Sequence, residues 1–136
     1  SIDIYSPPGA NVPSRILVVE DSPVIQRLIG MTLKPAGYEV EFCGSGTDGL
    51  DRARAGRPDL VILDIGLPGM DGWEVLEALR ADEETRDMPV MVLTAHGRAS
   101  VQDQADLKGA NLALSKPFDP SDFRDAVASL TQSQAA

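Results

Sequence analysis

The sequence predicts a doubly wound α/β fold in which helices cover both faces of a five-stranded parallel sheet. Short apolar runs alternate along the chain with longer amphipathic segments, which is the pattern of repeated strand and helix units. Four of these runs are nearly continuous in apolar residues, as strands covered on both faces must be. They span residues 16–19, 60–63, 90–93 and 112–114.

We interpret these four runs as central strands. In a fifth segment Val40 and Phe42 alternate with Glu39 and Glu41, which is typical of a strand with one less covered face. This segment is therefore expected at the edge of the sheet. Right-handed crossovers leave few topologies for five such strands, and the flavodoxin-like order 2-1-3-4-5 is the natural one.

Helix start signals follow the strands. Ser22 and Asp119 each precede a proline, and a polar cap followed by proline at the first helical position starts a helix well. The first helix is expected to stop near Pro35. Further helices are expected over 47–55, from Asp71 onward and over 98–108, of which the last has few apolar anchors and should be the most loosely held. The residues expected to face the core are Ile25, Leu28, Ile29, Thr32, Leu33, Leu50, Ala53, Arg54, Val75, Leu76, Leu79, Phe123, Ala126, Val127 and Leu130.

The length of 136 residues suits one domain, which we place at residues 14–131 between a flexible extension (1–13) and a flexible tail (132–136). A formal charge of −9 would repel a phosphate backbone, so direct nucleic-acid binding is not expected. There is no apolar run of membrane length and no secretion signal, so we expect a cytoplasmic protein without membrane insertion. The single cysteine, Cys43, is expected to be a small buried residue near a strand end.

Polar residues follow four of the predicted strands at the end where ligands bind in open α/β sheets. Each alone has an ordinary structural explanation, because an acid after a strand often caps a helix and a lysine is usually solvated. Their convergence at one edge is harder to explain in this way. The residues are Glu20, Asp21, Asp64, Thr94, Ala95 and Lys116.

Three carboxylates with one ammonium predict a site for a divalent cation. Unit charges about 4 Å apart repel by roughly 4 kcal/mol at an effective dielectric constant of 20. Oxygen ligands without thiolates favour Mg²⁺, and His96 is expected to be a loop residue rather than a ligand. A carboxylate can attack phosphorus to form an aspartyl phosphate if the developing charge is neutralised. The ammonium of Lys116, the hydroxyl of Thr94 and the backbone N–H of Ala95 are suitable groups.

The chain resembles the receiver domains of bacterial two-component response regulators. The resemblance rests on four motifs in order, ILVVEDSP, LVILDIGLPGMDG, VLTA and SKPF, and covers about residues 14–131. It implies the (βα)5 receiver fold with Asp64 as phosphoacceptor and Lys116 and Thr94 as its partners. It also implies Mg²⁺ held by Asp21, Asp64 and the Gly66 backbone carbonyl, with Glu20 acting through water.

The resemblance further implies a signalling phosphoacceptor that assists only its own phosphorylation and dephosphorylation. The donor would be a sensor histidine kinase or a histidine phosphotransfer protein. The family's lysine usually precedes a cis proline bond, here Lys116–Pro117, while Pro68 and Gly69 shape the loop after the acceptor. Trp73 is expected either near the site or as a partly exposed helix residue.

One departure from the family concerns output. Three residues before the lysine the family usually has an aromatic residue that moves inward with the threonine, and here the position is Ala113. We therefore expect the response, and a downstream partner, to involve the helix over 98–108.

Two other classes of function compete with this interpretation. Ala113 motivates a phosphorylation-independent interaction module with the same fold, although the full set of acids, lysine and threonine argues against it. A phosphatase of similar topology would usually need a second acid two residues after the nucleophile, where this chain has Gly66.

Overall fold

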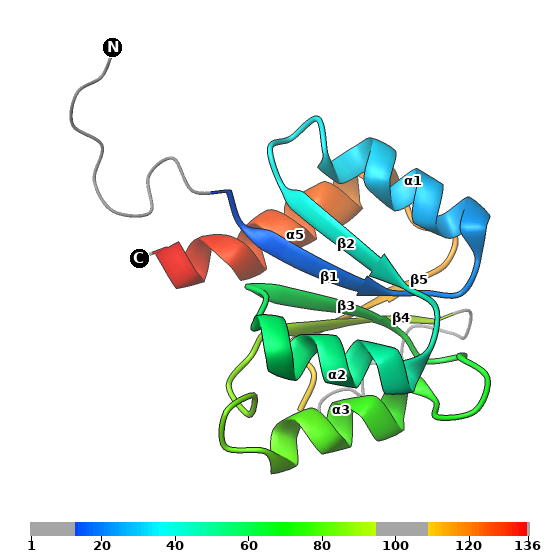
Figure 1. Ribbon diagram of the computed structural model, residues 1–136. Helices are drawn as coiled ribbons and strands as arrows, with labels where there is room; N and C mark the ends of the chain where they lie inside the picture. Colours follow the sequence, from blue (N-terminus) through cyan, green and yellow to red (C-terminus); the bar gives the residue numbers. More distant parts are fainter. Residues whose placement is uncertain (1–12, 95–108, 136) are drawn as a thin grey trace.

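The computed structural model describes residues 13–94 and 109–135, and these form a sheet with helices on both faces (Figure 1). The strands are β1 (Arg15–Val19), β2 (Glu39–Cys43), β3 (Leu60–Asp64), β4 (Val90–Thr94) and β5 (Leu112–Ser115). The helices are α1 (Pro23–Leu33), α2 (Gly46–Gly56), α3 (Gly72–Ala81) and α5 (Pro120–Ala135). The helix predicted over 98–108 and residues 1–12 of the extension predicted over 1–13 lie outside the described residues.

The five strands are parallel and lie in the order β2-β1-β3-β4-β5, which confirms the predicted topology. β2 lies at one edge, as its alternating pattern indicated. β5 lies at the other edge, as the predicted order requires, and its residues are only partly buried, so the interpretation of the run over 112–114 as a central strand was wrong. A short apolar run does not distinguish an edge strand from a central one, because a helix can cover part of either.

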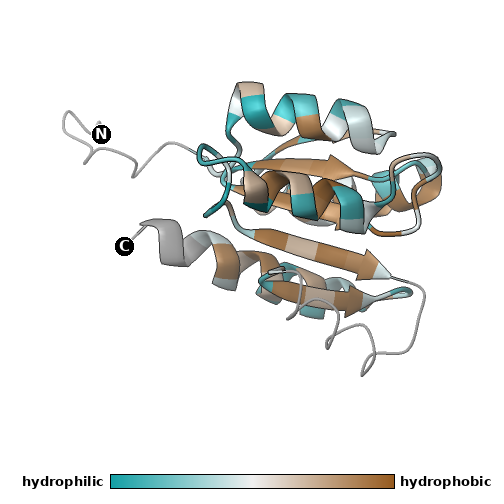
Figure 2. Cartoon of the chain, turned by 90° about the horizontal axis from the view of Figure 1, so that it is seen from below, coloured by the Kyte–Doolittle hydropathy of each residue, from teal (hydrophilic) through white to brown (hydrophobic). Residues whose placement is uncertain are grey.

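Alternate residues of each strand enter two separate cores. Ile16 and Val18 of β1 pack with α1 and α5, whereas Leu17 and Val19 pack with α2 and α3. Figure 1 shows the corresponding layers, with α1 and α5 on one face of the sheet and α2 and α3 on the other. In Figure 2 most strand residues are hydrophobic and the helices carry polar residues beside the apolar ones, as this sandwich requires.

The helix signals are largely confirmed. Ser22 caps α1 through a hydrogen bond from the Ile25 N–H (3.3 Å), with proline at the first helical position. The observed α2 begins at Gly46, one residue before the predicted start. Arg54 is exposed and pairs with Asp82 (3.2 Å), so its expected place facing the core was wrong. Its guanidinium keeps a partly solvated position.

Two features concern the remainder of the chain. α5 continues to Ala135, although the sequence indicated a tail from residue 132; the flexibility of that tail stays a prediction. Cys43 is buried at the end of β2, as expected, and this burial raises the pKa of its thiol to about 11. Within residues 13–94 and 109–135, no helix combines the length and apolarity needed to span a bilayer.

Candidate functional site

Three carboxylates lie together at the carboxyl ends of β1 and β3. Glu20 directly follows β1 and is completely buried, and Asp64 is the last residue of β3 and is 6% exposed. Asp21 is exposed to solvent at the rim. One carboxylate oxygen from each of the three lies within 4.8 Å of the others. Parallel pairing of β1 with β3 brings these acids from distant parts of the sequence to one edge.

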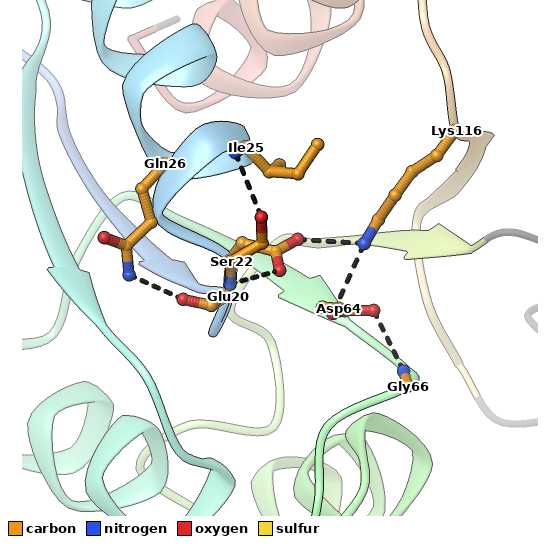
Figure 3. A network of polar contacts seen from close by, with 7 residues as sticks. All are labelled: Glu20, Ser22, Ile25, Gln26, Asp64, Gly66 and Lys116. Carbon is orange, nitrogen blue, oxygen red and sulfur yellow. Dashed lines mark hydrogen bonds and ion pairs between the residues drawn. The ribbon is translucent and has the colours of Figure 1, made fainter.

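Lys116 reaches this cluster from the segment after β5 (Figure 3). Its Nζ lies 3.0 Å from Glu20 Oε1 and 3.3 Å from Asp64 Oδ2. The backbone N–H of Lys116 donates to the Thr94 carbonyl (2.6 Å). This hydrogen bond holds the segment after β5 against the end of β4. The peptide bond from Lys116 to Pro117 is cis, as the resemblance implied. A single ammonium thus bridges the two buried acids.

Burial and charge shift the pKa values of this pair. Burial raises the pKa of Glu20 above its ordinary value, and the negative charge of Asp64 adds to this effect, while the Ser22 N–H and Lys116 oppose it. Burial alone would lower the pKa of Lys116, but the two carboxylates outweigh it and raise that pKa. Lys116 is therefore a cation at neutral pH.

Glu20 lies in the turn between β1 and α1 and is held by four contacts. Its backbone N–H donates to the Cys43 carbonyl of β2 (3.0 Å), and its Oε2 accepts from the Ser22 N–H (3.0 Å). Its backbone carbonyl accepts from the Gln26 side-chain amide (2.6 Å), and Lys116 contacts its Oε1. Glu20 is consequently a rigid part of the site.

The loop after β3 presents the Asp64 carboxylate. The Gly66 N–H donates to Asp64 Oδ1 (2.9 Å), while coordination of a metal through the Gly66 carbonyl stays a prediction. The start of α3 packs on the backbone of this loop. A Cβ on Gly72 would lie 2.5 Å from the Asp64 carbonyl oxygen, so only glycine allows this approach.

The remaining predicted residues are placed only in part. Thr94 ends β4 beside β3 and is 1% exposed, and it is in register with Ser115 of β5. Ala95 and His96 lie outside the described residues. Ala113 is paired with Val92 and packs against the core under α2 and α3. Trp73 is partly buried at the start of α3 and packs against the same core.

The donor set fits a hard divalent cation. All candidate ligands are oxygens, and three acids face one lysine. Glu20 Oε1 is fully buried and, among the described residues, has no hydrogen-bond donor, although Lys116 Nζ is close enough for an ion pair. Glu20 shares the charge of Lys116 with Asp64, so a further positive charge would stabilise the buried acids.

Sequence reasoning missed two residues that shape the site. The backbone N–H of Ser22 binds the Glu20 carboxylate, although the sequence identified Ser22 only as a helix cap. Gln26 holds the Glu20 carbonyl, and no pattern distinguished it from a solvated residue of an amphipathic helix. A glutamine one turn into a helix after a polar strand end is a weak signal at best.

Comparison with known proteins identifies the family. Residues 16–128 match the model of the response regulator receiver domain. The chain is 43% identical over 105 residues to the DNA-binding dual master transcriptional regulator RpaA of Synechocystis, covering 77% of this chain but only 44% of RpaA. It is 35% identical over 113 residues to sporulation initiation phosphotransferase F of Bacillus subtilis, covering 83% of this chain and 90% of that protein.

A solved structure agrees in fold. The receiver domain of sensor histidine kinase PA1611 from Pseudomonas aeruginosa matches with a TM-score of 0.81 and 30% identity, over 89% of this chain and 99% of that one. That structure has a magnesium ion coordinated in its active-site cleft. The order of the strands, the acidic cluster and the matched residues lead to one conclusion: the chain belongs to the response regulator receiver domain family, the phosphoacceptor modules of two-component signal transduction.

Proposed function

We propose that Asp64 accepts the phosphoryl group, and that the donor is a phosphohistidine of a sensor histidine kinase or a histidine phosphotransfer protein. A carboxylate oxygen of Asp64 forms a bond to phosphorus while the bond from phosphorus to the donor imidazole breaks, and its electron pair leaves with the imidazole. The observation that carries this proposal is the position of Lys116 Nζ, 3.3 Å from Asp64 Oδ2 and 3.0 Å from Glu20 Oε1.

Asp21, Asp64 and the Gly66 carbonyl would hold Mg²⁺ directly, and Glu20 would act through water. When bound, Mg²⁺ neutralises negative charge on the carboxylate and phosphoryl oxygens. The excess of acids over cations supports this assignment, because Glu20 and Asp64 share the single ammonium of Lys116.

The chain's own groups then share the charge of the transferred phosphoryl group. Lys116 contacts Asp64 already and needs only a small displacement to reach a phosphoryl oxygen. Thr94, at the end of the neighbouring strand, would donate its hydroxyl to a second oxygen, and the Ala95 backbone N–H is proposed for the same task. With these parts the domain assists its own phosphorylation and dephosphorylation and needs no external substrate.

The outward face of α1 is a suitable docking surface for the donor. Val24 is 75% exposed and Met31 is 68% exposed, and they lie seven residues apart on one helix face. Arg27 lies between them and Lys34 follows the end of α1, and both line the adjacent groove beside Phe42. A partner helix with apolar and acidic residues fits this face, and α1 begins at the acidic cluster itself.

The contact with a downstream partner is proposed for a segment that lies outside the described residues. We place the downstream contact over residues 98–108, because Ala113 replaces the aromatic residue of the usual relay. The same alanine favours the second candidate function, an interaction module that does not depend on phosphorylation.

Incubation with acetyl phosphate or phosphoramidate and Mg²⁺, followed by intact mass measurement, tests the proposal. One phosphoryl group should be added to the wild-type chain and to Asp51→Asn, a control at an exposed acid of α2, but not to Asp64→Asn. Equal labelling of Asp64→Asn would remove Asp64 from its role. Absence of labelling in the wild type, with a phosphohistidine donor tried as well, would favour the interaction module.

A further inference from the structure

Asp21 differs from the other two acids in how its position is determined. Glu20 and Asp64 are buried and held by several contacts, whereas Asp21 is exposed and its carboxylate has no hydrogen bond or ion pair among the described residues. The direction of its side chain toward the cluster must therefore come from the adjoining backbone. The peptide bond that joins Glu20 to Asp21 is part of that backbone.

Gln26 controls this peptide. Its own N–H donates to the Ser22 carbonyl (2.9 Å) in the first turn of α1, which fixes the residue on the helix. Its side chain reaches back and donates from Nε2 to the Glu20 carbonyl oxygen at 2.6 Å. This oxygen belongs to the peptide plane that carries Asp21, so the hydrogen bond opposes rotation of that plane (Figure 3).

We propose that Gln26 is a positioning residue for Mg²⁺: by holding the Glu20 carbonyl it keeps Asp21 directed at the metal site. The inference rests on the proposed metal site and adds a residue that makes no contact with the metal. Residues that hold ligands in place change metal affinity by about 10- to 100-fold when replaced. Because Gln26 acts through a single backbone hydrogen bond, we expect an effect at the lower end of that range, about tenfold.

The chemistry of the side chain makes the inference specific. A carbonyl oxygen only accepts hydrogen bonds, so position 26 must supply a donor. Gln26→Met keeps the length and removes the donor. Gln26→Glu keeps the shape but places an acceptor and a negative charge against the carbonyl. Gln26→Arg retains N–H donors on a long side chain and should restore most of the function.

The test measures Mg²⁺ affinity from the rise in melting temperature with Mg²⁺ concentration. Gln26→Met should need about tenfold more Mg²⁺ than the wild type for the same rise, and Gln26→Arg should stay close to the wild type. Asp51→Asn, a conservative exchange at an exposed residue of α2, is the control and should not change the affinity. Equal affinities of wild type and Gln26→Met would overturn the inference.

Two further arms separate the possible failures. If the wild type itself shows no Mg²⁺-dependent stabilisation, the proposed metal site is wrong and the inference falls with it. A second outcome is that Mg²⁺ stabilises the wild type but not Asp21→Asn, and that Gln26→Met has the same Mg²⁺ affinity as the wild type. In that case only the role of Gln26 is refuted. In metal-free buffer, hydrogen exchange at the Asp21 and Ser22 amides should be faster in Gln26→Met than in the wild type, and identical exchange there would also contradict the inference.

Discussion

The two ends of the parallel sheet carry charge in opposite ways. At the carboxyl end, Glu20 and Asp64 are buried with a single lysine between them, and Asp21 adds a third acid. At the amino end, three arginines are exposed and each has partners of its own. Arg15 donates to the carbonyls at the end of α2, Arg54 pairs with Asp82 (3.2 Å), and Arg57 pairs with Glu84 (2.8 Å).

This difference shows which end the protein uses for chemistry. Exposed ion pairs contribute little to stability and are screened by salt. Buried carboxylates in excess of cations destabilise the fold, so such a cluster persists where it binds a charged ligand. Substitutions at the two ends should therefore have very different effects.

The largest effect on stability is expected at Lys116. Lys116→Met leaves two buried carboxylates without a cation, and removing one partner of such a set costs about 3 kcal/mol. Urea unfolding in metal-free buffer measures this. Arg54→Met, which removes an exposed cation from the amino end, should leave the unfolding midpoint nearly unchanged. Similar losses for both variants would break the comparison between the two ends.

A second effect concerns the metal. Asp21→Asn should lose most of the stabilisation by Mg²⁺ while gaining stability in metal-free buffer, because one of three mutually repelling carboxylates is neutralised. Thermal melts with Mg²⁺ and with a chelator measure both changes. Full retention of the Mg²⁺ effect in this variant would contradict the assignment of Asp21 as a ligand.

The raised pKa of Glu20 predicts a pH dependence in metal-free protein. The unfolded chain releases this proton near the ordinary value of 4.5, whereas the folded protein retains it to higher pH. The folded state then binds more protons, so stability falls as the pH rises from 4.5 through the raised value. The wild type should therefore lose stability relative to Glu20→Gln over this window, as measured by urea unfolding. Parallel profiles would show that Glu20 is not perturbed.

The smallest effect is expected at the amino end. Arg57 adopts a left-handed conformation (φ 48°) after α2, where glycine is favoured. Arg57→Gly should raise the free energy of unfolding by about 0.5 kcal/mol, because the relieved backbone strain exceeds the value of the exposed pair with Glu84. A clear loss of stability would mean that this ion pair is stronger than its exposure indicates.

The sequence alone predicted the topology and most of the cluster, and the reason is physical. Parallel strands align their carboxyl ends, so the acids after β1 and β3 and the lysine after β5 meet at one edge. Sequence patterns do not encode contacts that depend on side-chain direction. The hydrogen bond from Gln26 to the Glu20 carbonyl and the surface position of Arg54 are two examples. The predicted strand order placed β5 at an edge, but its apolar run alone was interpreted as a central strand, because such a run resembles that of a strand covered on both sides.

The proposed function depends most directly on which residue carries the phosphoryl group. After incubation with a phosphodonor and Mg²⁺, reduction with borohydride converts an aspartyl phosphate into homoserine, and peptide mass spectrometry locates that residue. We predict homoserine at position 64 alone, formed only when Mg²⁺ is present. Homoserine at position 21 or at another aspartate, or equal modification in the presence of a chelator, would contradict the central claim.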